Sequence, residues 1–204
     1  MIRVVDYGLG NVQAFITMFT RLNIAAARAR TADDLQDAKR IVLPGVGAFD
    51  HAMELLDASG MRATLDDLVM RRRVPIFGVC VGMQILASSS DEGQRPGLGW
   101  VPGRVRSFKS LGIGRMMLPH MGWNDVQPTR PSPLFQGLEH DARFYFLHSF
   151  FFECDHEDHV LARANYGIDF ACAVGADNVF GAQFHPEKSH HFGAELLRNF
   201  AQGC

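Results

Sequence analysis

The stretch Gly78-Val79-Cys80-Val81-Gly82 decides the fold, because it joins two segments with different hydrophobic patterns. The apolar run over residues 74–77 predicts a buried strand, and the pattern over residues 83–87 predicts a helix. A chain that passes from strand to helix this quickly turns sharply at Cys80, and the flanking glycines remove side chains that would clash there. The helix start directs free amide groups and a positive dipole end at the sulfur, which favours the thiolate. Taken alone, however, a cysteine flanked by small residues is more often a thiol buried in the core than a nucleophile.

A second motif, Q-F-H-P-E-K-S over residues 183–189, supplies a base and an acid. His185 follows an apolar run over residues 178–182 that predicts a strand, and Glu187 lies two residues further on. Pro186 between them restricts the backbone and favours a rigid local turn. A catalytic cysteine needs a base, and the base needs an orienting group. The two motifs together predict a Cys80–His185–Glu187 triad, although H-P-E by itself fits a surface histidine beside a surface acid equally well.

Short buried strands alternate with helical segments in the first half of the chain. Residues 2–6 and 40–43 are compact apolar runs, and Asn11 stands where it can cap a helix with apolar residues at helical spacing. This alternation predicts a parallel sheet with helices on both faces. Further strands are expected at residues 104–108, 144–147, 150–153, 160–164, 170–174 and 179–183, and a last helix at 191–201. We therefore expect one α/β domain over residues 1–204, with an open, mixed sheet.

Composition narrows the classes of function. The chain has 204 residues, a net charge of −2 and 47% hydrophobic residues, so neither a basic surface nor nucleic-acid binding is expected. The N-terminus begins directly as a strand, without a signal-peptide layout, and no apolar stretch reaches the ~18 residues of a membrane span. The cysteines have no paired spacing that would indicate a disulfide scaffold: Cys80, Cys154, Cys172 and Cys204. These features predict a cytoplasmic protein.

No metal ion or cofactor is expected. His156 and His159 lie among acidic residues, and His190 and His191 follow the second motif. Neither group has the ligand spacing of a zinc site, and a charged turn is the better interpretation of the first.

The two motifs together resemble those of the class I, triad-type glutamine amidotransferases. Within that group the chain is most similar to the glutaminase subunits of imidazole glycerol phosphate synthase, since Met83-Gln84 stands where anthranilate- and guanine-nucleotide-type enzymes typically carry His-Gln. The similarity covers nearly the whole chain through further motifs: D-Y-G-L-G-N at 6–11, L-P-G-V-G-A-F at 43–49, P-H-M-G-W-N at 119–124, F-Y-F-L-H-S at 144–149 and L-R-N-F at 197–200. The resemblance implies a flavodoxin-like fold with a mostly parallel, mixed sheet flanked by helices.

The resemblance also implies a reaction, the hydrolysis of the side-chain amide of glutamine. Cys80 would attack the amide carbon, and His185, oriented by Glu187, would protonate the departing ammonia and then activate water against the thioester. The oxyanion hole would combine the Val81 N–H with a donor from the glycine loop at Val46 and Gly47, where a peptide has to rotate to present its N–H. The loop at residues 44–47 could instead be merely a tight turn.

Five residues are expected around the glutamine by the same resemblance: Gln84, Glu92, His148, Ser149 and Phe150. The last three would contribute mostly backbone contacts, and relatives often carry tyrosine where Phe150 stands. The alternatives are that Gln84 occupies an exposed helix position and that Glu92 is a solvated loop acid.

Asn11, Trp123, Tyr145 and Lys188 match positions that face a synthase partner in relatives. Tryptophan and tyrosine are favoured anchors of interfaces, although both could equally be core aromatics with one polar tip. The implied partner is a (β/α)8 cyclase subunit in a heterodimer. It would take the ammonia through its barrel and make imidazole glycerol phosphate and AICAR in histidine biosynthesis.

Two other functions stay open on the sequence. One is a paralogous glutaminase that supplies ammonia for amidation of a surface-polysaccharide sugar, which Ser88-Ser89-Ser90 and His190-His191-Phe192 favour slightly. The other is a non-catalytic regulatory subunit on the same fold, against which the intact triad argues. A cysteine hydrolase or chaperone of related fold would usually lack the H-P-E motif.

Overall fold

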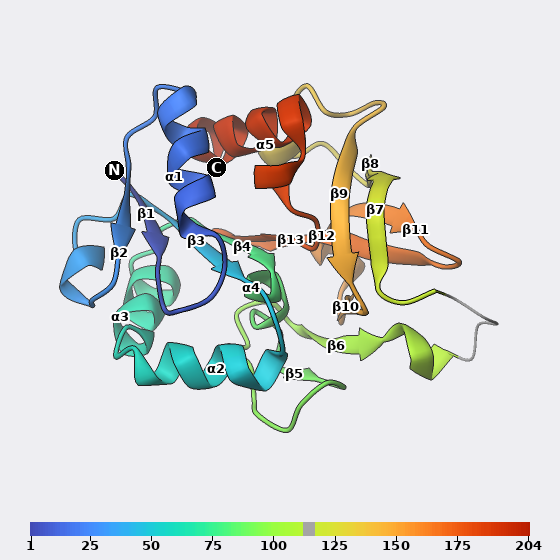
Figure 1. Cartoon of the computed structure of the whole chain (residues 1–204), viewed down its shortest axis with the longest axis horizontal. Coiled ribbons are helices and arrows are strands. Elements are labelled where there is room, and N and C mark those ends of the chain that lie inside the picture. Colours follow the sequence, from blue (N-terminus) through green and yellow to red (C-terminus); the bar gives the residue numbers. More distant parts are fainter. Residues whose placement is uncertain (112–116) are drawn as a thin grey trace.

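The computed structural model describes residues 1–111 and 117–204, and within them an 11-stranded mixed sheet runs through the molecule beside a separate two-stranded sheet (Figure 1). The main sheet has the order β2-β1-β3-β4-β13-β12-β10-β6-β5, with β11 and β8 beyond β12, and the small sheet pairs β7 with β9. The strands are β1 (Ile2–Val5), β2 (Ala26–Ala29), β3 (Arg40–Gly45), β4 (Ile76–Cys80), β5 (Ser89–Ser90), β6 (Gly103–Ser107), β7 (His120–Asp125), β8 (Gln127–Pro128), β9 (Arg143–His148), β10 (Phe150–Cys154), β11 (Val160–Asn165), β12 (Asp169–Ala176) and β13 (Val179–Ala182).

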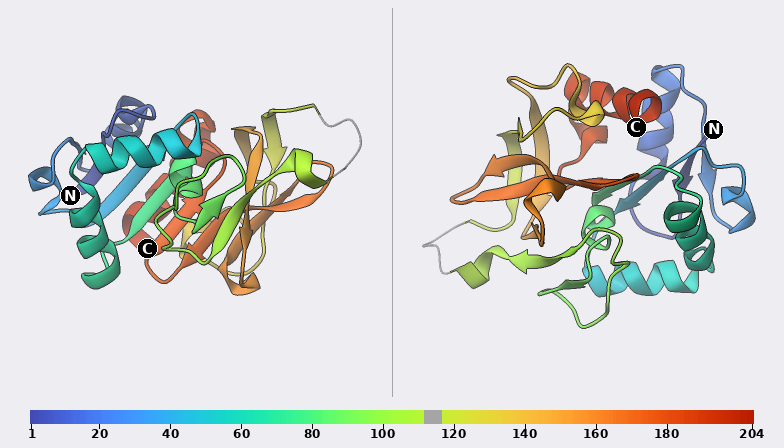
Figure 2. Two further views of the ribbon diagram at one scale, coloured as in Figure 1. Left: turned by 90° about the horizontal axis from the view of Figure 1, so that it is seen from below. Right: turned by 180° about the vertical axis from the view of Figure 1, so that it is seen from behind.

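Helices cover both faces of the parallel part of the sheet, as the alternating pattern predicts. Strands β2, β1, β3, β4 and β13 pair in parallel, and α1 and α5 lie on the opposite face from α2 and α3 (Figures 1 and 2). From β13 through β12, β10 and β6 the pairing is antiparallel, so the expected fold class is confirmed. The helices are α1 (Val12–Arg21), α2 (Phe49–Ala58), α3 (Arg62–Asp66), α4 (Val81–Gln84) and α5 (His190–Gly203).

Local sequence accounts for the start of α1. The Asn11 side chain accepts a hydrogen bond from the Ala14 N–H at 3.0 Å, which confirms the expected cap. Val12, Phe15 and Phe19 face the core on one side of this helix. The helix expected over residues 83–87 is wrong in its bounds, because α4 begins at Val81 and already ends at Gln84.

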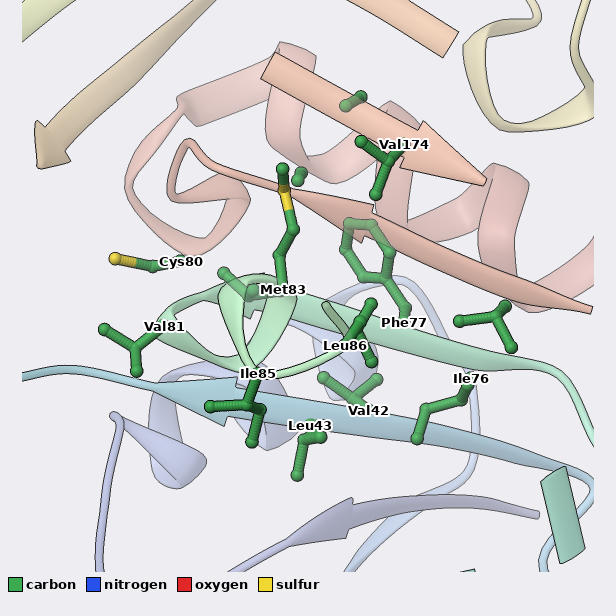
Figure 3. Close-up of a cluster of buried hydrophobic side chains, with 14 of the residues drawn as sticks. Val42, Leu43, Ile76, Phe77, Cys80, Val81, Met83, Ile85, Leu86 and Val174 are labelled. Carbon is green, nitrogen blue, oxygen red and sulfur yellow. The ribbon is translucent and has the colours of Figure 1, made fainter. Parts of the chain in front are cut away.

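The core that supports the Cys80 turn lies between β3, β4 and α4. Val42, Leu43, Phe77, Met83 and Leu86 are fully buried there (Figure 3). Cys80 lies at the edge of this cluster, and its sulfur points away from the cluster (Figure 3). Strands buried on both faces consist of continuous apolar runs, which explains why the sequence shows no alternation here.

Within the described residues, no helix is long and apolar enough to cross a membrane.

Candidate active site

Cys80 occupies a sharp, strained turn between β4 and α4. Its backbone has φ 57° and ψ −115°, a conformation that non-glycine residues rarely adopt and that is concentrated at functional sites. The two flanking glycines permit close backbone approach: a Cβ on Gly78 would lie 2.5 Å from the Gly82 carbonyl oxygen, and a Cβ on Gly82 would overlap the Leu43 carbonyl oxygen. The glycines therefore let the first turn of α4 lie directly against β3 and β4.

His185 and Glu187 form a buried pair next to Cys80. A 3-10 turn over Pro186–Lys188 brings the Glu187 Oε1 atom to 2.9 Å from His185 Nδ1, and the two side chains are only 4% and 5% exposed. Burial alone would lower the pKa of His185, but hydrogen bonds and charge from Cys80 and Glu187 outweigh it and raise the pKa to about 9. With Nδ1 bound to Glu187, the ring presents Nε2 to the sulfur. The three residues are arranged as nucleophile, base and orienting acid.

Gln183 is a further neighbour of the sulfur that the motif analysis missed. Its side-chain N–H points to Cys80 Sγ at 3.8 Å, and its Oε1 accepts a hydrogen bond from Gln84 Nε2 at 2.9 Å. Both glutamines are buried, so the alternative of an exposed helix position for Gln84 is excluded. The sequence did carry a signal, because Gln183 directly follows the apolar run that predicts a strand. A glutamine at the end of a buried strand needs hydrogen-bond partners.

A cavity of about 240 Å³ opens in front of these groups. It contains Cys80 and His185 but not Glu187, which lies behind His185. All eight residues expected in the oxyanion hole and around glutamine line it, with Pro119 and Leu147 in addition: Val46, Gly47, Val81, Gln84, Glu92, His148, Ser149 and Phe150. A larger cavity of about 610 Å³ lies among residues 128–140 and includes none of the expected site residues. Residues from distant parts of the sequence therefore meet at one small pocket.

The loop after β3 passes close to the start of α4. A Cβ on Gly45 would lie 2.5 Å from the Gly82 N atom, and Gly47 has a φ of 99°. Val46 is 44% exposed at the cavity wall. The loop thus lies beside the start of α4, and Val46, Gly47 and Val81 line the same cavity.

Two of the expected glutamine contacts are held by backbone groups. Glu92 is exposed, but its Oε2 accepts a hydrogen bond from the Phe49 N–H at the start of α2, at 2.9 Å. This anchors the carboxylate at the cavity wall. His148 Nδ1 lies 2.7 Å from the Phe150 carbonyl oxygen, so its side chain is engaged within the loop that joins β9 and β10.

Trp123, Tyr145 and Lys188 lie together on one surface. Trp123 is 40% exposed, so the alternative of a core aromatic is excluded for it. Its ring meets the Tyr145 ring edge-on, with the centroids 6.4 Å apart. Lys188 Nζ lies 5.8 Å from the Tyr145 ring centroid. Asn11 is exposed as well, with its side chain capping α1.

No group of three or more His, Cys, Asp or Glu residues in the described ranges, 1–111 and 117–204, could hold a metal ion.

Comparison with known proteins finds one family and several full-length relatives that are similar to this chain. The family model of class I glutamine amidotransferases matches residues 3–204. The chain is 63% identical to the imidazole glycerol phosphate synthase subunit HisH of Bdellovibrio bacteriovorus, over 99% of this chain and 100% of that protein. It is 50% identical to the HisH subunit of Leptospira interrogans, over 98% and 99% of the two chains. A similar HisH subunit, HisH 2 of Pseudomonas aeruginosa, is 43% identical over 99% of both chains.

Solved structures confirm the fold alone, because their sequence identity is low. A crystal structure of a glutamine amidotransferase superimposes with a TM-score of 0.76 at 23% identity, covering 98% of this chain and 96% of that one. The structure of PurLQS from Thermotoga maritima gives 0.74 at 20% identity, with coverage of 98% and 96%.

Proposed function

The chain belongs to the class I glutamine amidotransferases and, within them, to the family of imidazole glycerol phosphate synthase HisH subunits, and from this premise we propose how its site works. It is a glutamine amidotransferase, the glutaminase subunit of that synthase. The sugar-amidating paralogue and the non-catalytic regulator are not favoured, because the full-length similarity at 63% identity is to a HisH subunit. The serine and histidine runs that favoured the paralogue carry less weight than this match.

The proposed reaction proceeds through a thioester on Cys80. The sulfur attacks the side-chain amide carbon of glutamine, and the imidazolium of His185 gives its Nε2 proton to the departing nitrogen, which leaves as ammonia. Neutral His185 then takes a proton from water as the water oxygen attacks the thioester carbon. Collapse of this intermediate breaks the carbon–sulfur bond, releases glutamate and restores the Cys80–His185 pair. Glu187 holds Nδ1 and stabilises the imidazolium throughout.

Backbone N–H groups would stabilise the oxygen of the tetrahedral intermediates. We propose the Val81 N–H as one donor and the peptide at Val46 and Gly47 as the other. The close approach of this loop to the start of α4 supports both assignments. A donor of this kind typically contributes about 10²–10³ in rate.

Glutamine binding follows from the cavity wall. The anchored carboxylate of Glu92 suits the α-amino group of the substrate, and Gln84 lies toward the same end. The Ser149 and Phe150 backbone, with His148 behind it, would contact the rest of the amino-acid moiety. Lining of one cavity by all of these residues supports the assignment.

We propose that the ammonia passes to a cyclase subunit in a heterodimer. The relatives are named as subunits of a synthase, which supports this proposal. The exposed Trp123 and Lys188 and the half-buried Tyr145 would face this partner, with Asn11 at the edge. Exposed Met121, 65% accessible, extends the same apolar surface. A single domain over residues 1–204 and a cytoplasmic location belong to this proposal, and the four free cysteines fit such a location.

One observation supports this function most directly. Cys80 and His185 of the buried triad line the same cavity as the residues proposed to bind glutamine. We would measure glutamate release from glutamine by the chain alone, with its cyclase, and with cyclase plus the histidine-pathway ribotide. Strong stimulation by cyclase and ribotide together, abolished by Cys80→Ala and retained by the matched Cys154→Ala, is expected. No release under any condition, or full activity of Cys80→Ala, would contradict the proposal.

A further inference from the structure

Two buried histidines meet outside the triad. His120 on β7 and His148 on β9 are opposite each other in the antiparallel ladder, and His120 Nδ1 lies 2.9 Å from His148 Nε2. They are 3% and 5% exposed. The His120 ring stacks on Phe146 and Tyr166, with centroids 4.8 and 4.0 Å away. The thioester chemistry proposed above involves neither ring, although His148 lies behind the backbone proposed to contact glutamine.

The hydrogen bonds of the pair allow one arrangement of protons. His148 Nδ1 faces the Phe150 carbonyl oxygen at 2.7 Å and therefore carries a hydrogen, because a carbonyl only accepts. In a neutral ring, His148 Nε2 is then an acceptor, so His120 Nδ1 donates to it. His120 Nε2 accepts in turn, and the Asn124 side-chain N–H lies 3.3 Å from it. Burial supports neutral rings, since it lowers the pKa of His120 to about 4 and that of His148 to about 3.

One end of this chain of hydrogen bonds lies at the glutamine cavity. The Phe150 carbonyl that His148 holds also accepts from Gln84 Nε2 at 3.4 Å, and both residues line the cavity. Gln84 continues through Gln183 toward the Cys80 sulfur. The orientation of one carbonyl therefore affects the polar wall on which the substrate would rest.

The other end lies on β7. Residues alternate across this strand, so His120 and Asn124 face inward while Met121 and Trp123 are exposed on the outer face. Asn124 is fixed by a second hydrogen bond, from Nδ2 to the Asn165 carbonyl oxygen at 2.8 Å. The chain of hydrogen bonds thus runs through the small sheet, on β7 and β9, and meets the main sheet at both ends, at Asn165 of β11 and Phe150 of β10.

We propose that His120 is a positioning residue for amide hydrolysis, which acts through His148 to hold the Phe150 carbonyl at the glutamine cavity. This inference rests on the proposed glutaminase function. Without the His120 donor, His148 keeps its Nδ1–H, but its Nε2 becomes a buried acceptor with no partner. The ring has to shift to bring Nε2 to water or another donor, the bond from Nδ1–H to the Phe150 oxygen weakens, and the cavity wall changes shape.

The test compares two substitutions of one ring in the complete complex with the cyclase. His120→Phe keeps an aromatic ring between the stacking neighbours and removes the donor, whereas His120→Asn places an amide N–H near the position of Nδ1. We expect His120→Phe to raise the KM for glutamine by about 10- to 100-fold while kcat changes by less than about 3-fold, which is the scale of one buried polar group losing its partner. His120→Asn should stay within about 3-fold of wild type in both constants. Tyr166→Phe, which keeps the stack and lies outside the hydrogen-bonded chain, is the matched control.

A second readout works without turnover. Nitrogen NMR of the wild-type rings should show both His120 and His148 as the neutral Nδ1–H tautomer at pH 7, and in His120→Phe the His148 Nε2 resonance should shift because this nitrogen loses the hydrogen bond that it accepts. Equal kinetics for His120→Phe, His120→Asn and wild type, or an Nε2–H tautomer of wild-type His148, would overturn the proposal. If wild type itself releases no glutamate, the proposed function fails, and the NMR result still decides the tautomers of the pair.

Discussion

Replacing Glu187 by glutamine isolates the charge of the triad from its geometry. Glu187 Oε1 lies 2.9 Å from His185 Nδ1, and both side chains are almost fully buried. A glutamine has the same shape, and its amide oxygen can accept the same N–H, so Glu187→Gln keeps the ring oriented and removes the negative charge. Any loss then measures stabilisation of the imidazolium rather than its position.

The magnitude follows from the pKa of His185. At about 9 it lies about 2.5 above the ordinary 6.5, which corresponds to about 3 kcal/mol in favour of the charged ring. Cys80 and Glu187 both contribute, against the opposing effect of burial. Loss of one nearby opposite charge lowers such a pKa by about 1–3, so in Glu187→Gln the pKa of His185 should lie at about 6–8, and at least half of the rings should be neutral at pH 8.

The assay is the rate at which a glutamine-analogue electrophile labels Cys80, measured from pH 6 to pH 10, together with glutamate release in the cyclase complex. The sulfur reacts as a pair with the imidazolium, so we expect the smaller imidazolium fraction to slow labelling at pH 7 by up to about 10-fold. Glutamate release should fall by about 10²–10⁴-fold. Glu195→Gln removes a carboxylate on α5 that is paired with Arg198 away from the cavity, and serves as the control. An unchanged labelling profile in Glu187→Gln would refute the reasoning.

The same pKa predicts how stability depends on pH. Because folding raises the pKa of His185, its contribution is fully present below pH 6.5 and is lost as the pH rises through about 9. Urea unfolding of wild type should show a loss of up to about 3 kcal/mol from this group between these pH values, and Glu187→Gln should show a smaller loss. Equal pH dependence of the two proteins would contradict the assignment.

Three further predictions test the surroundings of the triad. Gly82→Ala should lower the free energy of unfolding by about 3 kcal/mol or more in urea titration, because its Cβ would overlap a backbone carbonyl. Gly181→Ala, where the added Cβ would meet side chains rather than backbone, Met83 at 2.7 Å and Leu86 at 3.2 Å, should cost about 1 kcal/mol, and equal costs of the two substitutions would contradict the clash. Trp100→Phe removes the 3.0 Å bond from the indole N–H to Asp66 and should cost about 1–2 kcal/mol in the same titration; an unchanged midpoint would show that this bond contributes nothing. Gln183→Leu should slow the labelling of the catalytic cysteine by about 10-fold through loss of the N–H that faces the sulfur, and normal labelling in a folded variant would exclude that contact.

Local chemistry explains why much of the site was readable from the sequence. The turn at Cys80 needs small residues on both sides, and the short distance from His185 to Glu187 makes their pairing a local event. Continuous apolar runs marked the central strands, because those strands are buried on both faces. These features depend on neighbours in sequence, so a pattern of a few residues predicts them.

β7 shows where sequence reasoning fails. Its inner face carries His120 and Asn124, and its outer face carries Met121 and Trp123, so polar residues lie inside and apolar ones outside. This pattern is the reverse of the alternation that marks a half-buried strand, and the strand was not predicted. On the inner face, the His120–His148 hydrogen bond accounts for the polar residues. On the outer face, the proposed partner surface accounts for the apolar ones.

The sequence by itself determined the strand–turn–helix around the nucleophile, the local pairing of base and acid, and the α/β class. Which residues meet at the cavity is visible only in the folded chain. Gln84 and Gln183 form a hydrogen bond although they are 99 positions apart in the sequence, and His120 and His148 do so at 28 positions. The physical reason is that turns, caps and periodic burial arise from short-range sterics and local hydrogen bonds. The partner of a buried polar group, in contrast, is set by how strands far apart in the chain are ordered in the sheet.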